Sequence, residues 1–149
     1  MKIFLRHIKE LQETEIEIKY QKMSDKISHI VSYLRQYDVI LEGVDENKIF
    51  QIPLEKVCYI ETTDRKTYIY IDKLVYESRK TIQTLEGALE STTIVRIGKS
   101  TLLNISKVKS VRPYPNHRLL LELDNGEKLI VSRRYIENFR ERIRREYGA

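Results

Sequence analysis

The sequence predicts a mainly β domain preceded by a small segment of mixed α and β structure. From Asp38 onward, short apolar runs alternate with turn-forming residues, which is the pattern of a meander of short antiparallel strands. Asn125-Gly126 lies between two such runs and is the strongest hairpin signal, because Asn-Gly readily adopts the positive φ angles of a two-residue turn. Helical apolar spacing is confined to three stretches, so helices are expected to be few.

The first 40 residues predict two strands and a helix. Residues 2–8 form a short apolar run, and residues 14–20 alternate apolar with charged side chains, as in a half-buried strand. Ser24 or Asp25 can then cap a helix. Its apolar side chains recur at helical spacing: Ile27, Ile30, Val31, Leu34 and Tyr37. We expect this stripe to pack within the chain, with a dimer contact as the alternative.

The rest of the chain predicts short strands and two further helices. The clearest strands are residues 39–41, 48–52, 57–60, 68–71, 74–76, 107–114, 117–123 and 128–131. Thr81 can cap a short helix that buries Ile82, Leu85 and Leu89. The chain finishes in a basic helix whose apolar side is made of Ile136, Phe139, Ile143 and Tyr147.

Residues 94–104 are the stretch around which we expect the domain to be organised. Apolar flanks enclose a tip with cations and hydroxyls: Arg96, Lys99, Ser100 and Thr101. Gly98 permits backbone conformations that a side chain would forbid. A loop held at both ends by buried residues is suited to presenting donors to phosphates and base edges. An ordinary surface turn is the alternative.

Composition excludes several classes of protein. Hydrophobic content of 41% with 33% charged residues describes a globular domain. No apolar run approaches the roughly 20 residues of a membrane span, and no signal-peptide cleavage site follows the first residues, so we expect a cytoplasmic protein. Cys58 is the only cysteine, which rules out an intrachain disulfide and, in its apolar run, predicts a buried inert thiol. The histidines lie far apart, so we expect no metal site and no cofactor.

The spacings that common catalytic sites need are missing. Gly98-Lys99-Ser100 lacks the earlier glycine of a phosphate-binding loop, and no Gly-x-Ser-x-Gly elbow occurs. Most carboxylates alternate with apolar residues, as on a solvated sheet face. We therefore expect neither an enzyme nor a small-molecule substrate, and no concave pocket lined with titratable groups.

The positive charge is concentrated in the later part of the chain. Residues 1–50 hold eight Lys and Arg against nine Asp and Glu, a net charge of −1. Residues 51–149 hold 19 against 13, a net charge of +6, so the whole chain carries +5. Three loops there are rich in cations and hydroxyls: residues 62–67, 96–101 and 132–134. Arginine can hold guanine or phosphate through two parallel hydrogen bonds. Three such loops in one basic domain predict nucleic-acid binding.

Four stretches, in a fixed order and spacing, also carry a resemblance. They are Val57-Cys58-Tyr59-Ile60-Glu61, Thr84-Leu85-Glu86 to Leu89, Val95 to Asn104, and Asn125-Gly126 to Tyr135. Together they resemble the LytTR family of bacterial DNA-binding domains over residues 45–145. The resemblance implies an elongated fold of about ten short strands in three small antiparallel sheets, with one short internal helix and a C-terminal helix. It also implies that loops enter successive major grooves of DNA and bend it.

Carried over by position, the resemblance assigns the DNA contacts to the three basic loops. The residues are Arg65, Lys66 and Thr67 at the first tip, Arg96, Lys99 and Ser100 in the second loop, and Arg133 and Arg134 at the last strand-to-helix junction. The loop of residues 62–67, Lys99 and Arg134 would read bases, while Arg96 and Ser100 support Lys99 or hold phosphate. Many family members have histidine at the position of Gly98, so that contact is lost here. Asn104 matches a family asparagine that we assign to turn structure and not to DNA.

The resemblance divides the chain into an N-terminal appendage, residues 1–40, and a LytTR-type DNA-binding domain, residues 41–149. The appendage is too short for the phosphorylation receiver found in many relatives, so we expect a stand-alone regulator. We expect the appendage to serve dimerisation or regulatory docking. The expected partners are double-stranded DNA, a second copy of the chain and, as in some stand-alone relatives, an inhibitory membrane protein.

These features predict a sequence-specific transcription regulator that acts as a dimer on paired sites. The alternative is a non-catalytic β module that recognises a protein or RNA partner through its basic loops.

Overall fold

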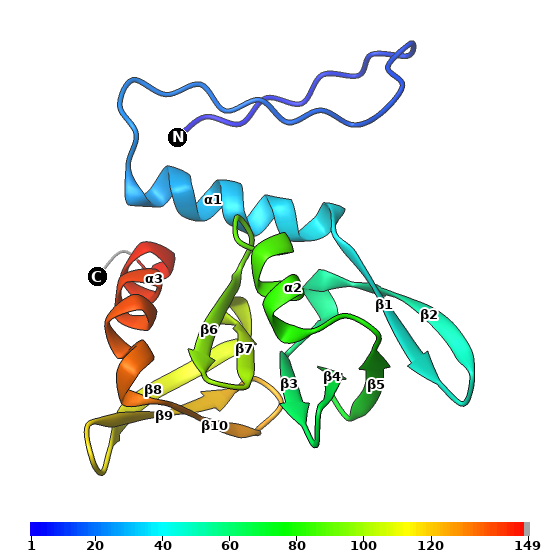
Figure 1. Cartoon of the computed structure of the whole chain (residues 1–149). Helices are drawn as coiled ribbons and strands as arrows, with labels where there is room; N and C mark the ends of the chain where they lie inside the picture. Colours follow the sequence, from blue (N-terminus) through cyan, green and yellow to red (C-terminus); the bar gives the residue numbers. More distant parts are fainter. Residues whose placement is uncertain (148–149) are drawn as a thin grey trace.

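The computed structural model describes residues 1–147, which contain ten short strands and three α-helices (Figure 1). The strands are β1 (Ile40–Asp45), β2 (Lys48–Pro53), β3 (Tyr59–Thr63), β4 (Lys66–Ile71), β5 (Leu74–Ser78), β6 (Ile94–Gly98), β7 (Thr101–Asn104), β8 (Val108–Tyr114), β9 (Arg118–Leu123) and β10 (Lys128–Val131). The helices are α1 (Asp25–Arg35), α2 (Ile82–Ala88) and α3 (Ile136–Tyr147), and single 3-10 turns include η1 (Gln36–Asp38) and η4 (Arg133–Tyr135). The expected mainly β fold, with a short internal helix and a C-terminal helix, is confirmed.

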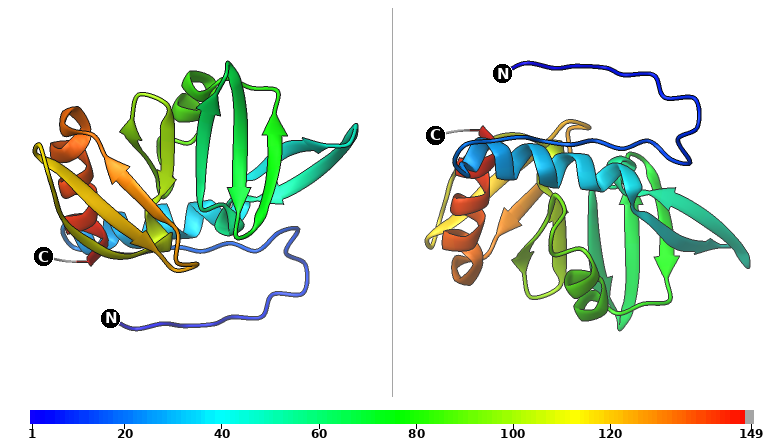
Figure 2. Two further views of the ribbon diagram at one scale, coloured as in Figure 1. Left: turned by 90° about the horizontal axis from the view of Figure 1, so that it is seen from below. Right: turned by 90° about the horizontal axis from the view of Figure 1, so that it is seen from above.

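The strands form two antiparallel sheets instead of the expected three. The larger has the order β2-β1-β5-β4-β3-β7-β6, and the smaller has the order β10-β9-β8. The β1–β2 hairpin joins the larger sheet through one register pair, Val44 with Glu77, and projects from the body of the molecule (Figures 1 and 2). Gly43 permits this close crossing, because a Cβ there would lie 2.6 Å from the Cβ of Tyr76. A hairpin attached at one point therefore takes the place of a third sheet.

The β6–β7 hairpin contributes to two apolar cores at once. Val95, Ile97 and Leu103 pack in a core shared with the small sheet and α3. Ile94 and Leu102 pack in a second core together with α2. Alternate side chains of a strand point to opposite faces, so a hairpin that is apolar on both faces can join two cores. The central position expected for residues 94–104 is confirmed.

The helix predicted in the appendage packs within the chain. Ser24 caps it, and the Ser24 hydroxyl accepts a hydrogen bond from the N–H of Ile27 at 3.3 Å. The helix α1 lies against α3, and its apolar side chains Ile27, Ile30, Val31 and Leu34 are half-buried. In the following turn Gln36 is buried, and its Oε1 accepts from the hydroxyl of Thr93 at 3.1 Å. No helix in the described chain is long and apolar enough to cross a membrane.

The C-terminal helix is attached to the edge of β6. The guanidinium of Arg142 donates to the backbone oxygens of Thr92 and Ile94 at 2.7 and 3.3 Å. Phe139 is buried on the apolar side, as predicted. The side chain of Tyr147, assigned to the same side, lies outside the described residues.

Residues 1–23, here called the N-terminal arm, contain no strand, so the two strands expected there are wrong. The arm runs past α1 as an extended segment that turns back on itself (Figure 1). Most of its apolar side chains face solvent, with Ile16 65% and Leu5 96% exposed, whereas Ile18 is half-buried. An alternating pattern produces a strand only where another strand satisfies its backbone groups and covers its apolar face. No strand of the described chain pairs with the arm.

Two glycine predictions also need correction. Gly98 does not have a positive φ, and a Cβ there would make only an ordinary contact with the Ser132 hydroxyl oxygen, at 3.5 Å. The position therefore accommodates a side chain. In the β9–β10 turn, Gly126 has a φ of 88° but Asn125 does not have a positive φ. The Gly126 N–H donates to the oxygen of Leu123 at 2.9 Å, so the turn is not the expected two-residue type.

Asn104 is fully buried and connects two segments of backbone. Its Nδ2 donates to the oxygens of Leu54 and Val57 at 3.3 and 2.9 Å. Its Oδ1 accepts from the N–H and the hydroxyl of Ser106 at 3.2 and 2.7 Å. The structural role expected for Asn104 is confirmed, because a side chain with no solvent-exposed area cannot contact DNA.

Replacing Asn104→Ala should lower the free energy of unfolding by about 1–3 kcal/mol, because buried carbonyls and a buried N–H lose their partners. Urea denaturation followed by circular dichroism measures this difference. Asn138→Ala, an exposed position on α3, is the control and should change stability by less than about 0.5 kcal/mol. Equal stability of the two variants would contradict the role given to Asn104.

Candidate nucleic-acid interface

The β3–β4 turn forms the first basic loop. Asp64 and Arg65 occupy its two central positions with φ angles of 52° and 67°, as a tight turn that matches the strand twist requires. Arg65 and Lys66 are both exposed. The Lys66 ammonium is 3.8 Å from the Glu77 carboxylate at the surface, where such a pair contributes little energy. Both cations therefore remain accessible at the end of the hairpin.

Thr67 does not lie at the tip, which corrects the position expected for it. Its side chain is 6% exposed, and its hydroxyl lies 3.2 Å from that of Thr62 directly across the hairpin. A hydrogen-bonded cross-strand pair of this kind stabilises the register of the two strands. Thr67 thus supports the loop, and Asp64 and Arg65 form its tip.

Arg96 holds the β6–β7 turn in place. Its Nε donates to the oxygen of Gly98 at 3.0 Å, and its Nη2 donates to the oxygen of Lys99. Its Nη1 lies 2.8 Å from Oε1 of Glu86 on α2, and the side chain is only 16% exposed. Of the two roles expected for Arg96, these contacts favour support of Lys99 over a phosphate contact. Lys99 itself is exposed, and Ser100 is half-buried beside it.

The third loop is η4, between β10 and α3. Arg133 and Arg134 are exposed there. Tyr135 follows them, and its ring centre is 5.9 Å from the guanidinium carbon of Arg134 and 5.9 Å from that of Arg96. Guanidinium groups at this distance are attracted to an aromatic face. The tyrosine therefore lies between the second and third loops and restricts both.

Backbone hydrogen bonds join the three loops to one another. The N–H of Thr62 donates to the oxygen of Ser100 at 2.9 Å, and the N–H of Ser132 donates to the oxygen of Ile97 at 2.9 Å. In the left view of Figure 2, the β3–β4 turn, the β6–β7 turn and the start of α3 lie along one edge of the molecule, and the N-terminal arm lies at the opposite edge. We call the edge that carries the two turns and the start of α3 the loop edge.

Two further cations lie at the loop edge that the sequence analysis did not identify. Arg79 and Lys80 are exposed and follow β5 directly. Because Ser78 pairs with Thr67 in the β4–β5 register, β5 ends beside the β3–β4 turn. In the sequence, the two cations are visible only as a basic pair between a predicted strand and a predicted helix cap. The strand register is needed to show which end of the sheet they occupy.

Several carboxylates near the loop edge already have partners. Glu86 pairs with Arg96, Glu77 lies close to Lys66, and Oε2 of Glu61 accepts from the hydroxyl of Thr101 at 3.3 Å. Arg96 and Lys66 offset negative charge that would otherwise repel a polyanion, whereas the neutral hydroxyl of Thr101 only orients the Glu61 carboxylate. The exposed cations therefore dominate the potential that an approaching phosphate backbone meets.

A shallow pocket of about 280 Å³ lies at the end of the large sheet opposite the loop edge. Its lining includes Cys58, Asp72, Asp124, Lys56 and Lys107, so the expectation that no pocket lined with titratable groups would be found is wrong. Burial raises the pKa of the Cys58 thiol, which makes the thiol a poor nucleophile. No cluster of three or more metal-binding side chains occurs within residues 1–147.

Comparison with known proteins identifies one family over most of the chain. The family model described as the LytTr DNA-binding domain matches residues 47–144. Sensory transduction protein LytT of Enterococcus faecalis is 30% identical over 98 residues, which are 66% of this chain and 40% of that protein. Transcriptional regulatory protein LytR of Staphylococcus aureus is 26% identical over 107 residues, 72% of this chain and 44% of that protein. The chain thus spans less than half the length of these two curated relatives.

A solved structure supports the same assignment. It is the LytTr DNA-binding domain of a putative methyl-accepting/DNA response regulator from Bacillus cereus. It is 28% identical, superposes with a TM-score of 0.66, and the match covers 70% of this chain and 95% of that one. The sequence match over residues 47–144 and the shared fold show that the chain belongs to the LytTR family of DNA-binding domains.

Proposed function

We propose that this chain is a sequence-specific, non-catalytic DNA-binding regulator of transcription. The β3–β4 turn, the β6–β7 turn and η4 enter successive major grooves of double-stranded DNA. The observation that carries the proposal is the loop edge, where backbone hydrogen bonds hold three loops with exposed cations side by side. Membership of a DNA-binding domain family supports the choice of partner.

The cations that read bases in this proposal are those whose backbone the fold holds most firmly. Lys99 projects from a turn whose backbone oxygens are held by Arg96, and Arg134 follows a junction anchored to Ile97 and stands beside the Tyr135 ring. Arginine can form two hydrogen bonds to the edge of guanine in the major groove. A side chain on a rigidly held backbone loses less conformational entropy on binding, so its contact discriminates better between DNA sequences.

Affinity comes from contacts to phosphate. These are assigned to Arg65, Lys66, Ser100 and Arg133, together with the newly located Arg79 and Lys80. Such contacts release counterions and do not depend on sequence. Thr67 acts indirectly, since its hydroxyl orders the hairpin that carries Arg65.

The same proposal includes the assembly and its setting. The chain acts as a dimer on paired sites in the cytoplasm, and residues 1–40 form the appendage that mediates assembly. Docking of the appendage to an inhibitory membrane protein is the second use proposed for it. A module that recognises RNA or protein through the same basic loops is the competing proposal.

Replacing Arg134→Ala or Lys99→Ala should weaken binding to the preferred duplex by about 1–3 kcal/mol and relax the preference at one base position. Fluorescence anisotropy with the preferred duplex and with single-base variants measures both effects. Lys73→Ala is the matched control, because Lys73 is exposed at the opposite end of the same sheet. Equal loss on preferred and scrambled duplexes would show that the replaced side chain contacts phosphate and reads no base.

Replacing Glu86→Ala should weaken binding to the preferred duplex about threefold to tenfold, although it removes a negative charge. The reason is that Arg96 loses the partner that fixes its guanidinium beneath the β6–β7 turn, and small misplacement of a contact group costs affinity. If only the change in charge mattered, removal of this carboxylate would tighten binding to DNA. Glu90→Ala removes the same charge from an exposed position just after α2 and should not weaken binding. Tighter binding by both variants would refute the positioning role of Arg96.

A competition experiment distinguishes sequence-specific binding of double-stranded DNA from binding of RNA. The preferred duplex should outcompete a scrambled duplex by about a thousandfold or more. The same titration with single-stranded RNA of matched length provides the comparison. If RNA competes as well as the preferred duplex does, the proposed DNA-specific function is wrong.

A further inference from the structure

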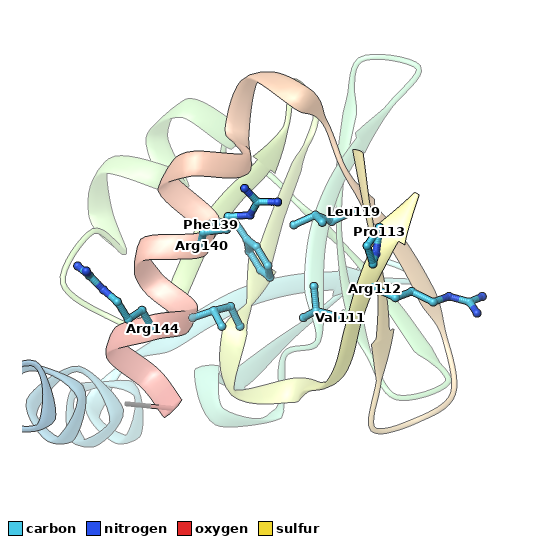
Figure 3. A pocket seen from close by; sticks show the side chains of 8 residues that line it. Val111, Arg112, Pro113, Leu119, Phe139, Arg140 and Arg144 are labelled. Atoms are coloured by element: carbon cyan, nitrogen blue, oxygen red, sulfur yellow. The ribbon is translucent and has the colours of Figure 1, made fainter. Parts of the chain in front are cut away.

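A groove of about 390 Å³ lies between β8 and α3, away from the β3–β4 and β6–β7 turns (Figure 3). Its floor is apolar and includes Leu119, Phe139 and Ile143, and its margins carry Arg112, Arg140 and Arg144. Figure 3 shows Leu119 and Phe139 facing each other across the groove, whereas Arg112 and Arg144 point outward on opposite sides. An apolar floor between arginine margins fits a segment with apolar side chains on one face and carboxylates on the other.

One wall of the groove is an unpaired sheet edge. The strand β8 is the outer strand of the small sheet, with β9 on its inner side only. Val111 in this strand is 40% exposed. An outer strand with exposed apolar side chains is a surface on which another extended chain can dock.

The N-terminal arm has the complementary chemistry. Within residues 13–20, Glu13, Glu15 and Glu17 alternate with Ile16 and Ile18. In an extended chain, residues two apart lie about 6.6–6.8 Å apart on the same face, so the isoleucines share one face, and the three glutamates share the other with Lys19. The large apolar side chains exposed on the arm are Met1, Ile3, Phe4, Leu5, Ile8, Leu11, Ile16, Tyr20 and Met23. Exposed apolar surface of this extent marks an interaction site.

We propose that residues 13–20 of one copy dock in the β8–α3 groove of a second copy. Ile16 and Ile18 face the apolar floor, and Glu15 and Glu17 face Arg140 and Arg144 at the margin. Each copy donates an arm and receives one, which gives a closed two-fold dimer. The inference rests on the dimer of the proposed function and names its surfaces.

The arrangement of the arm favours a second copy as the occupant. In Figure 1 the arm of this chain runs along the side of α1 that faces away from the sheets and then turns back, so that its N-terminus lies above α1. The residues that line the groove include none from its own arm. Figure 2 places the arm and the loop edge at opposite sides of the molecule. An arm docked in the groove leaves the β3–β4 and β6–β7 turns uncovered, because no residue of either turn lines the groove.

Charge reversal in the full-length chain tests the pairing. Sedimentation equilibrium should give a dimer for the natural chain. The double variants Glu15→Arg with Glu17→Arg, and Arg140→Glu with Arg144→Glu, should each raise the dimer Kd at least about tenfold, because like charges then meet. Combining all four changes should restore the Kd to within about threefold, because the pair is reversed as a whole.

The matched control is Glu42→Arg with Asp45→Arg on β1, which changes the same charge away from both surfaces and should leave the Kd unchanged. Hydrogen exchange should protect the amides of residues 14–20 in the dimer and expose them in either double variant. A natural chain that is monomeric, a dimer indifferent to the reversals, no recovery in the fourfold variant, or an arm protected in a monomer would each overturn the proposal.

Binding to a duplex with a single half-site separates this inference from the proposed function. The Glu15→Arg, Glu17→Arg variant should bind one half-site with the preference of the natural chain, since its loop edge is unchanged. If the dimer follows the charge pattern but no duplex is preferred, the DNA proposal fails and the interface stands. If a duplex is preferred but the dimer ignores the charge pattern, only the interface fails.

Discussion

The β6–β7 hairpin is the element on which the rest of the domain depends. Its alternating side chains fill two separate cores, and the backbone oxygens near its tip accept hydrogen bonds from Thr62 and Ser132. A strand pair buried on both faces cannot slip by one residue without moving apolar side chains out of both cores. Its register therefore also fixes where the β3–β4 turn and η4 lie. The loop edge is a consequence of this packing and not of any attraction among its cations.

Like charges at the loop edge repel one another, so the fold must hold them together. The contacts that hold the loops together are made by less exposed side chains beneath these cations. Arg96 binds the backbone of the β6–β7 turn and is itself held by Glu86 on α2, and the paired hydroxyls of Thr62 and Thr67 stabilise the first hairpin. These partners satisfy polar groups beneath the tips, while Arg65, Lys99, Arg133 and Arg134 stay exposed. The result is a preorganised surface that loses little conformational freedom when a polyanion binds.

The two ends of the molecule differ in their degree of order for a physical reason. The loop edge is tied to both cores, whereas the N-terminal arm has an alternating pattern but no strand to pair with. Its apolar side chains are left in water, which is unfavourable in proportion to their area. A groove with arginines at its margins lies at the edge of the small sheet, and the acidic alternation of residues 13–20 complements it. The arm and the loop edge lie at opposite edges of the molecule (Figure 2).

The sequence by itself determined most of the short strands after residue 38, the helix caps at Ser24 and Thr81, the central place of residues 94–104 and the resemblance to a DNA-binding family. These features depend on local properties: period-two patterning, capping side chains and turn residues act over a few neighbours. Only the tertiary structure decided that Thr67 is buried, that Arg96 supports a turn, that Arg79 and Lys80 join the loop edge, and that the arm forms no strand. The place of Thr67, of Arg79 and Lys80 and of the arm depends on which strand supplies a partner, and the role of Arg96 depends on the fold that brings Glu86 of α2 beside it. Pairing of this kind leaves no local pattern from which it can be read.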